Sequence, residues 1–400
     1  MVNGKSIKVP CPNHLPFIVY QKPCGTLPER TMKRLRLELK KDIDRSYDVL
    51  VGRGILASLH SEIQRLGSFS SYGLVTDEVV SPLVAEPLQD QLRSDGIDTT
   101  LIALPPGESA KTMKTVLDLC QQLLAHGFDR RSLLLAIGGG VVGDIAGFAA
   151  AIYMRGIPYI QVPTTLLAQV DSSLGGKTGV DLPAGKNLLG AFHQPRLVLS
   201  DLNVLSSLPA AARCEGFAEM IKAALIQDLE LFSILEREGA DLLDTDNPVL
   251  ETIIAKACKV KCQVVNRDEH ESGLRRILNF GHTLGHALEA AANYNISHGQ
   301  AVAIGMALAI RLSRQWAGLS EDGAARALNL IQELGLPTDM PQNIDPEALL
   351  VPLEKDKKIQ AGICHFVLLE EIGRAAIHPI PVNELRQSLT QIQELRDLGI

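Results

Sequence analysis

The sequence places two histidines four residues apart and a third close behind. In GHTLGH, His282 and His286 lie at i and i+4, so a helix would present both rings on one face. His298 follows in SHGQAVA, and the carboxylates Glu219 and Glu289 are available as oxygen ligands. A histidine pair alone is more often structural, but three imidazoles with carboxylates suit zinc or a similar divalent ion. These residues therefore predict a metal site in which both members of the pair are ligands.

A glycine-rich turn is predicted between a buried strand and a helix. Residues 133–137 form a short apolar run, three glycines follow at 138–140, and a helix is expected over 145–153. Backbone N–H groups in such a unit face an anionic ligand. The spacing matches neither GxGxxG nor a P-loop, so an ordinary tight turn fits this segment equally well.

Further along, cationic and polar residues alternate with glycines in a segment expected to be a loop. Asp171, Lys177, Lys186 and Asn187 belong to it. Glycine permits close backbone approach and lysine supplies a point charge, so the segment favours an oxyanion ligand. Other cations and polar groups could line the same pocket: Lys222, Lys261, Arg275, Asn279, Lys357 and Lys358. Together with the predicted metal site and a nucleotide-binding sheet, these cations indicate metal-assisted redox chemistry on a small polyanion.

The elements that must position these residues divide the chain in two. Strands are expected at 35–43, 46–52, 70–77, 99–104 and 133–137, with helices at 55–66, 81–94 and 112–126 between them. This alternation predicts a largely parallel sheet with helices on both faces. Seven helices then follow at 210–227, 229–238, 247–266, 282–293, 297–315, 320–334 and 346–357, with a strand at 364–369 and a possible partner at 375–380. We predict a poorly ordered extension (1–33), an α/β nucleotide-binding domain (34–206) and a mainly helical domain (207–400).

Composition excludes several classes of protein. The chain has 400 residues, 46% apolar and 21% charged, with a net charge of −7, which is typical of a globular protein and gives no support to nucleic-acid binding. Its apolar runs are too short to cross a bilayer, and its N-terminus lacks the pattern of a signal peptide. Seven cysteines without a CxxC pair predict no disulfide framework and a cytoplasmic location.

From about residue 35 to its end, the chain resembles the 3-dehydroquinate synthase family of sugar phosphate cyclases. The motifs that carry the resemblance occur in the family's order: PPGESAKT, GGGVVGDIAGF, RGIPYIQVPTTLLAQVDSSLGGKTGVD, GKNLLGAFHQP, GFAEMIK, DEHESGLRRILNFGHTLGHALE, SHGQAVAIGM and DKK. The resemblance implies a Rossmann-like α/β domain followed by a mostly α-helical metal- and substrate-binding domain. It also implies a phosphate-eliminating lyase of the shikimate pathway. That enzyme converts 3-deoxy-D-arabino-heptulosonate 7-phosphate to 3-dehydroquinate by transient NAD oxidation, elimination, reduction and aldol closure.

The resemblance also implies a role for each matching residue. The metal, zinc or cobalt, would be held by Glu219, His282 and His298, which replaces the i, i+4 pair as the expected ligand set. NAD would contact Asp77, Glu108, Lys111, Gly139, Gly140, Val141, Asp144, Thr164 and Thr165, with Lys177 and Lys186 nearby. Catalysis would involve Asp171, Lys177, Lys222, Lys261, Arg275, Asn279 and His286. The substrate would also meet Lys186, Asn187, one of Lys357 and Lys358, and Arg155 from a second subunit, which implies a homodimer.

Three other functions remain open at this point. A sister cyclase would act on sedoheptulose 7-phosphate or glucose 6-phosphate, which lack the carboxylate that Arg275 and Asn279 would meet. A glycerol-type metal-dependent dehydrogenase would form NADH in a net reaction. A catalytically inactive nucleotide-binding protein would bind without turnover.

Overall fold

The apolar runs of the first half pair into one six-stranded sheet. Its strands lie in the order β3 (Asp48–Gly52), β10 (Leu197–Asp201), β7 (Tyr159–Pro163), β6 (Leu133–Gly138), β4 (Tyr72–Asp77) and β5 (Thr99–Leu104). Every neighbouring pair is parallel. The predicted parallel sheet is confirmed, with β7 and β10 as additional strands that the sequence analysis did not identify.

Helices cover both faces of this sheet, because alternate residues of each strand point to opposite sides. Leu134 and Ala136 of β6 belong to the core beneath α3 (Met113–Ala125) and α4 (Gly140–Ile152). Leu133 and Leu135 face the opposite core, which α1 (Leu59–Leu66) and α2 (Glu86–Ser94) cover. The short helices η1 (Ile55–Ser58) and η2 (Ser81–Ala85) complete the predicted helices 55–66 and 81–94.

Helix α4 begins earlier than predicted. It starts at Gly140 rather than residue 145, and ends at Ile152, followed by the short helix η4 (Tyr153–Arg155). Glycine disfavours helix by about 1 kcal/mol relative to alanine. Here close packing explains its use, because a Cβ on Gly143 would lie 2.8 Å from Gln161 Oε1.

The segment predicted as a loop after Asp171 is an antiparallel hairpin. Its strands are β8 (Lys177–Leu182) and β9 (Gly185–Phe192), and the hairpin packs against α4. Lys177, Lys186 and Asn187 therefore project from strands, so the loop prediction was wrong. Glycines obscured the strands, and those at 179 and 190 are required by backbone contact across the pair.

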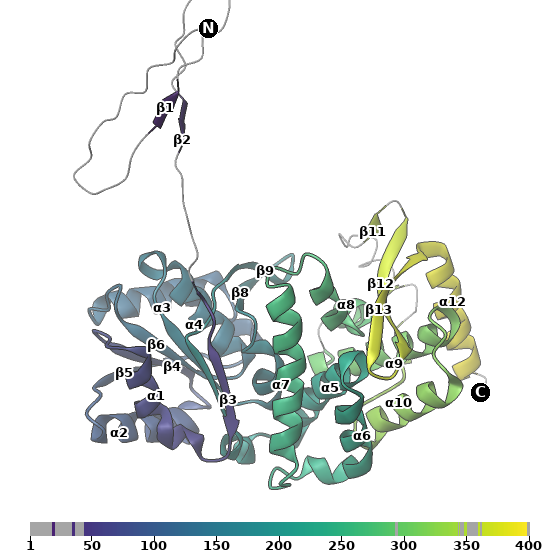
Figure 1. Ribbon diagram of the computed structural model, residues 1–400, viewed down its shortest axis with the longest axis horizontal. Helices are drawn as coiled ribbons and strands as arrows, with labels where there is room; N and C mark the ends of the chain where they lie inside the picture. Colours follow the sequence, from purple (N-terminus) through teal and green to yellow (C-terminus); the bar gives the residue numbers. More distant parts are fainter. Residues whose placement is uncertain are drawn as a thin grey trace, which may run out of the picture. The chain divides into compact units, whose positions relative to one another are not determined.

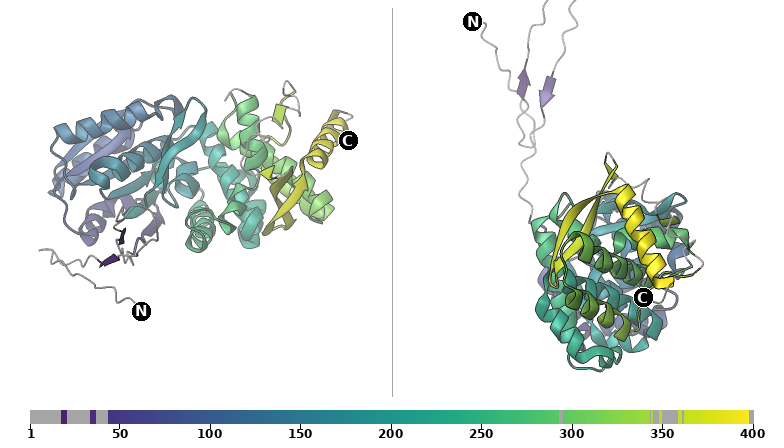
Figure 2. Two further views of the ribbon diagram at one scale, coloured as in Figure 1. Left: turned by 90° about the horizontal axis from the view of Figure 1, so that it is seen from above. Right: turned by 90° about the vertical axis from the view of Figure 1, so that its right-hand side faces the viewer.

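The second half is mainly helical, as predicted. Its helices are α5 (Ala210–Gln227), α6 (Leu229–Glu238), η7 (Gly239–Leu243), α7 (Leu250–Arg267), η8 (Leu274–Asn279), α8 (His282–Ala291), α9 (His298–Trp316), α10 (Glu321–Glu333) and α12 (Val382–Asp397). The predicted late strands appear as β12 (Ile363–Glu371) and β13 (Arg374–Pro381), joined by β11 (Ile359–Gln360). Figure 1 shows α7 between the sheet and the remaining helices of this half. Figure 2 shows α12 beside the β12–β13 hairpin, at the end of the helical half away from the large sheet.

This computed structural model describes residues 18–20, 34–36, 44–292, 295–342, 344, 348–349, 359–360 and 362–397. The chain divides into two units, Met1–Arg45 and Ser46–Ile400. In the first unit, β1 (Ile18–Tyr20) pairs antiparallel with β2 (Arg34–Arg36). The remainder of the predicted extension 1–33, most of the predicted strand 35–43 and most of the predicted helix 346–357 lie outside the described residues. The boundary near residue 206 stays a prediction.

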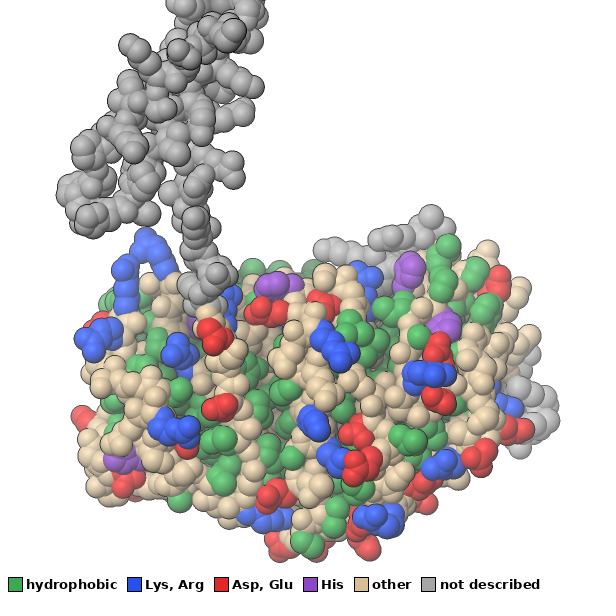
Figure 3. All heavy atoms as spheres, in the orientation of Figure 1, with side chains coloured by type: hydrophobic (Ala, Val, Ile, Leu, Met, Phe, Trp, Pro, Cys, Tyr) green, Lys and Arg blue, Asp and Glu red, His purple; other side chains and the backbone are tan. Residues whose placement is uncertain are grey.

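Other general features can be stated for the described part of the chain. None of its helices combines the length and apolar character needed to cross a membrane. The described cysteines are all free thiols: Cys120, Cys214, Cys258, Cys262 and Cys364. On the face shown in Figure 3, the described basic and acidic side chains are interspersed.

Candidate functional site

The glycine turn lies where three adjacent parallel strands end. Asp77 ends β4, Gly139 follows β6 and Thr164 follows β7, so all three lie at the carboxyl edge of the sheet. A Cβ on Gly140 would lie 2.9 Å from Ser172 Oγ, so glycine lets the first turn of α4 pack closely against Ser172. The hydroxyls of Thr164 and Ser172 are buried and lack a hydrogen-bond partner among the described residues. This edge offers polar groups and a helix N-terminus to an anion.

A buried ion pair stands beside this turn. Lys111 Nζ lies 2.6 Å from Asp144 Oδ2 and donates a hydrogen bond of 2.5 Å to Asn187 Oδ1 on the hairpin. Glu108 is farther away, with Oε1 4.0 Å from Lys111 Nζ. Burial raises the pKa of Asp144 to about 6, although Lys111 opposes this shift. Lys111 thereby connects the sheet edge to the hairpin.

Three further residues predicted to contact NAD lie near this edge. Asp77 Oδ1 accepts hydrogen bonds of 2.9 Å from the backbone N–H groups of Val79 and Val80, which holds the chain at the end of β4. Thr165 Oγ1 accepts one from Ala168 N at 3.1 Å, and Val141 lies in the first turn of α4.

The second cluster contains Glu219, His282 and His298, whose ligand atoms all lie within 4.8 Å of one another. Glu219 Oε1 is 3.4 Å from His282 Nε2 and 3.9 Å from His298 Nε2. Both Glu219 oxygens are buried. Oε2 pairs with the ammonium of Lys222, and Oε1 faces the two imidazole nitrogens without a hydrogen-bond partner among the described residues. A buried carboxylate left in this state beside two imidazole nitrogens fits a divalent cation with nitrogen and oxygen ligands.

The protonation of His282 also fits metal binding. Burial and the nearby Lys222 lower the pKa of His282, so its ring is neutral at physiological pH. The Nδ1–H of His282 donates to Phe280 O at 3.2 Å, which leaves the Nε2 lone pair directed at Glu219. Burial opposes ionisation of Glu219, but the ammonium of Lys222 outweighs it and holds the pKa of Glu219 well below its usual range.

Buried lysines connect this cluster to Asp171. Lys222, on α5 one turn after Glu219, forms an ion pair with Glu219 Oε2, and its Nζ lies 4.0 Å from Asp171 Oδ1. Lys261, on α7, donates to Asp171 Oδ1 at 2.6 Å and to Asp171 O at 2.7 Å. Asp171 itself lies in the π-helix η5 (Ala168–Ser172), a distortion frequent at functional sites. The chain Glu219–Lys222–Asp171–Lys261 is thus one charged network.

Arg275 is a buried cation, with 2% of its surface exposed. Its guanidinium donates to Gly175 O at 3.2 Å and to Glu269 O. Among the described residues, no carboxylate lies within ion-pair distance of it. Two of its five N–H groups are thus accounted for by backbone carbonyls, which leaves others available to an anionic ligand.

Glu271 is a charged residue of this region that the sequence analysis did not assign. It forms an ion pair with Lys177 and accepts a hydrogen bond of 2.8 Å from Asn279 Nδ2. Its φ of 59° is in the left-handed region, which is uncommon for glutamate. Asp268 supports this turn by accepting hydrogen bonds from Ser272 N at 2.8 Å, Gly273 N at 2.7 Å and Arg275 N at 3.0 Å. Of these features, the sequence displays only an acidic stretch before a glycine.

Four other predicted residues remain. His286 adjoins the second cluster, because ligand atoms of His286, Glu289 and His298 lie within 4.8 Å of one another. His286 is exposed, and its ring lies 5.3 Å from that of His282 and 5.9 Å from that of His298. Arg155 is exposed beyond the C-terminal end of α4, so within one chain it is not brought to the network around Asp171. Lys357 and Lys358 lie outside the described residues.

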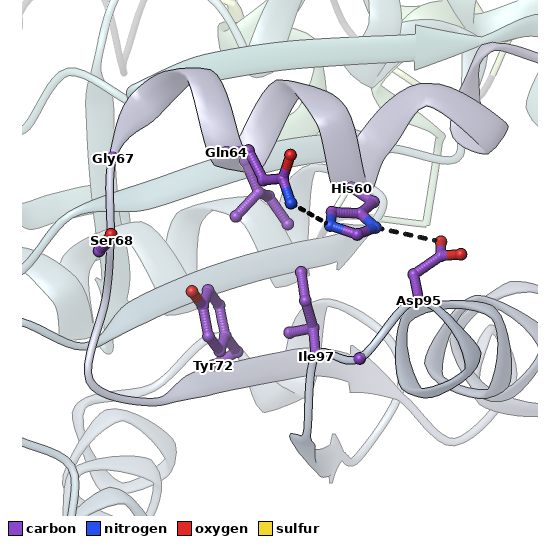
Figure 4. Close-up of a pocket in the computed structure, with 9 residues that line it drawn as sticks. His60, Gln64, Gly67, Ser68, Tyr72, Asp95 and Ile97 are labelled. Atoms are coloured by element: carbon purple, nitrogen blue, oxygen red, sulfur yellow. Dashed lines mark hydrogen bonds and ion pairs between the residues drawn. The ribbon is translucent and has the colours of Figure 1, made fainter.

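A hollow of about 420 Å³ lies elsewhere, beside α1 and the start of β4. His60, Gln64 and Asp95 line it, and Figure 4 shows His60 between the other two, in contact with both. His60 Nε2 is 2.6 Å from Gln64 Nε2, and His60 Nδ1 is 3.6 Å from Asp95 Oδ2. We assign no ligand to this hollow, since its polar side chains already contact each other.

Comparison with known proteins identifies the family of this chain. Residues 101–215 match the family described as 3-dehydroquinate synthase N-terminal, and residues 216–359 match 3-dehydroquinate synthase C-terminal. The chain belongs to the 3-dehydroquinate synthase family. A 3-dehydroquinate synthase of Symbiobacterium thermophilum is 45% identical over 336 residues, which cover 83% of this chain and 94% of that protein.

Solved structures of other cyclases share the fold of this family member. A 2-epi-5-epi-valiolone synthase from Streptomyces hygroscopicus subsp. jinggangensis, with NAD+ and Zn2+ bound, is 33% identical with a TM-score of 0.81, covering 90% of this chain and 99% of that chain. A 2-deoxy-scyllo-inosose synthase complexed with carbaglucose-6-phosphate, NAD+ and Co2+ is 30% identical with a TM-score of 0.78, covering 86% and 96%. The predicted family and fold class are confirmed.

Proposed function

We propose that this chain is a phosphate-eliminating lyase that converts 3-deoxy-D-arabino-heptulosonate 7-phosphate to 3-dehydroquinate and phosphate. The observation that carries the proposal is the network Glu219–Lys222–Asp171–Lys261, which joins a metal-capable set to paired ammonium and carboxylate groups. The 43–45% identity to curated 3-dehydroquinate synthases supports the same reaction.

The sheet edge is the proposed site of NAD, which would supply reversible hydride transfer. The N–H groups of Gly140 and Val141 in the first turn of α4 would face its pyrophosphate, and Asp77 at the end of β4 would face a ribose hydroxyl. Lys111, held by Asp144, would place a positive charge between this edge and the hairpin. Gly139, Thr164, Thr165 and Glu108 would complete the contacts.

Glu219, His282 and His298 are the proposed ligands of zinc or cobalt, which would act as a Lewis acid on the substrate hydroxyl that is oxidised. Lys222 and Asp171 would orient the neighbouring hydroxyls, because their charged atoms lie next to this set. Burial lowers the pKa of Lys261, although Asp171 counteracts this, so Lys261 is the lysine of the network most easily deprotonated. A buried lysine with a lowered pKa is suited to proton transfer.

The substrate has two anionic ends, and the site offers separate cations to each. Lys177, Lys186, Asn187 and His286, with one of Lys357 and Lys358, would hold the phosphate and stabilise the charge that develops as it leaves. Arg275 and Asn279, with Lys261, would hold the carboxylate. A buried guanidinium without a paired carboxylate among the described residues favours a substrate that brings its own.

A homodimer with composite sites is part of the proposal. Arg155 follows the C-terminal end of α4, which is about 18 Å long from Gly140 to Ile152, so it is far from the N-terminal end of α4 proposed to bind NAD. Apolar side chains are exposed just at and beyond the C-terminal end of α4, at Ile152 and Met154, and on the hairpin, at Leu182, Leu188, Leu189 and Phe192. Such a surface suits contact with a second copy, which would bring Arg155 to its partner's phosphate. We also infer a cytoplasmic location, which the free thiols support.

The test of the reaction is a comparison of substrates with the purified chain. We expect 3-dehydroquinate from the heptulosonate phosphate, and a much lower kcat/KM with sedoheptulose 7-phosphate. A preference for sedoheptulose 7-phosphate would instead assign the chain to the sister cyclases and contradict the proposed role of Arg275.

The composite site has a separate test that uses two inactive variants. Chains carrying Arg155→Ala would be mixed, denatured and refolded with chains carrying His282→Ala. In a mixed dimer, one site would combine an intact His282 with an intact Arg155. Random pairing would then restore about a quarter of wild-type activity. No recovery, with mixed dimers verified by mass, would contradict a site shared between subunits.

A further inference from the structure

The ring of His298 lies between two buried carboxylates. Its Nε2 is 3.9 Å from Glu219 Oε1, and its Nδ1 is 3.6 Å from Glu289 Oε1. Glu289 is 3% exposed and lies on α8, seven residues after His282 and three after His286, on the same helix face. Nothing in the proposed reaction yet uses this buried charge.

His282 shows what the outer nitrogen of such a ligand requires. Its Nδ1–H donates to the backbone carbonyl of Phe280, and its Nε2 faces Glu219. A neutral histidine carries one N–H, so the group that accepts it decides which nitrogen is left for a metal. For His298, the group facing Nδ1 is the carboxylate of Glu289. Both rings thus present Nε2 to Glu219. Nδ1 faces a backbone carbonyl in His282 and a carboxylate in His298.

Glu289 could itself be a metal ligand, because His286, Glu289 and His298 also form a group within 4.8 Å. The two groups share His298. Contact with a lysine does not show which group is the metal site, since Lys222 pairs with Glu219 and Lys186 Nζ lies 3.1 Å from Glu289 Oε1. The position of the His282 proton favours the group around Glu219. The N–H of His282 points away from Glu219, so the Nε2 atoms of His282 and His298 both face that carboxylate. Glu289 is then behind the ligand set rather than within it.

We propose that Glu289 is a positioning residue that fixes the tautomer and orientation of His298 for metal binding. This inference rests on the proposed function, since it requires the metal to be held by Glu219, His282 and His298. The contact with Lys186 adds a connection across the molecule, because Lys186 comes from the β8–β9 hairpin and Glu289 from α8. One carboxylate thus couples a metal ligand to a lysine proposed to contact substrate.

The test measures metal affinity rather than turnover. Zinc dissociation constants would be determined by competition with a chelator, and the visible absorption of the Co2+-loaded protein would be recorded, for Glu289→Gln and Glu289→Met. Loss of an outer partner of a metal-bound histidine typically weakens binding about 10–100-fold. We expect Glu289→Gln near the lower limit, because an amide still accepts a hydrogen bond, and Glu289→Met near the upper limit. Both should alter the cobalt spectrum.

Glu215→Gln is the matched control. Glu215 is half-buried one turn before Glu219 and lies close enough to His298 to interact with it electrostatically, yet it forms no ion pair with a described residue. Its zinc affinity should stay within about twofold of wild type, since it does not hold a ligand. If Glu289→Met fails to fold, Glu289→Gln, which keeps the side-chain length, decides the question alone. Wild-type affinity and an unchanged cobalt spectrum in Glu289→Gln would overturn the inference while leaving the proposed function intact. A wild-type chain that binds no metal would overturn both.

Discussion

Close packing of α8 against α9 depends on glycine, and Gly305→Ala tests whether this packing builds the metal site. A Cβ on Gly305 would overlap the backbone O of Gly281, the residue just before α8, and lie 2.7 Å from the backbone N of Gly285 in α8. Restoring an ordinary contact of 3.4 Å requires the helices to separate by at least about 0.7 Å (3.4 minus 2.7). Metal–ligand distances are fixed to about 0.2 Å, and α8 carries His282 whereas α9 carries His298.

Two opposing terms set the expected stability of Gly305→Ala. Helix propensity favours alanine by about 1 kcal/mol. Overpacking typically costs about 1–3 kcal/mol, and overlap of backbone with backbone places this case near the upper limit. We therefore expect the metal-free variant to lose about 2 kcal/mol of unfolding free energy. Its zinc affinity should fall at least about tenfold, as for other displaced ligands.

Urea unfolding of the metal-free protein and chelator competition for zinc measure these two effects. Gly323→Ala in α10 is the control, because its Cβ would meet only side-chain ends, Leu319 Cδ1 at 3.2 Å and Ser320 Oγ at 3.1 Å. We expect that variant to bind zinc as tightly as wild type and to be no less stable, since helix propensity favours alanine by about 1 kcal/mol. Gly305→Ala with unchanged stability and unchanged zinc affinity would refute the proposed dependence of the site on this packing.

Three further predictions follow from the charged groups. Arg275→Ala should lower kcat/KM about 10–100-fold more for the heptulosonate phosphate than for sedoheptulose 7-phosphate, because a charged hydrogen bond is worth about 1.5–3 kcal/mol. Equal losses for the two substrates would contradict a role of Arg275 in binding the carboxylate. Asp171→Asn should lower the unfolding free energy measured in urea by about 3 kcal/mol, because it leaves the buried ammonium of Lys261 without its carboxylate and only 27% of the Asp171 side chain is exposed. Wild-type stability would contradict this. Because burial raises the pKa of Asp144 to about 6, the folded state binds more protons than the unfolded state between about pH 4 and 6. The stability of wild type relative to Asp144→Asn, measured by urea midpoints, should therefore fall as the pH rises through that window, and a constant difference would contradict it.

Local patterns were sufficient to predict most of the secondary structure. The helices at 210–227 and 229–238 and the strand at 99–104 have the predicted bounds, since each has a clear periodicity and a marked end. The β8–β9 hairpin was missed because its glycines resemble a loop, while its reason for being a hairpin is contact with α4. The predicted helix at 145–153 began too late for the same reason, because the glycines at the start of α4 also resemble a loop.

The pairings within the site depend on tertiary contacts that local patterns do not reveal. Lys177 and Glu271 are 94 residues apart, and the left-handed conformation of Glu271 has no signature in its own sequence. The sequence identified Glu289 as a carboxylate near three histidines, but the orientation of each ring decides whether it is a ligand. The ligand set itself came from family resemblance, since spacing alone favoured His282 with His286.

The central claim is a cyclisation in which NAD is reduced and reoxidised within one turnover. The direct measurement gives the purified chain the heptulosonate phosphate, NAD+ and Zn2+, and follows phosphate release and NADH absorbance together, with and without EDTA. The account predicts metal-dependent phosphate release with no net NADH. Stoichiometric accumulation of NADH, or phosphate release that EDTA does not affect, would contradict it.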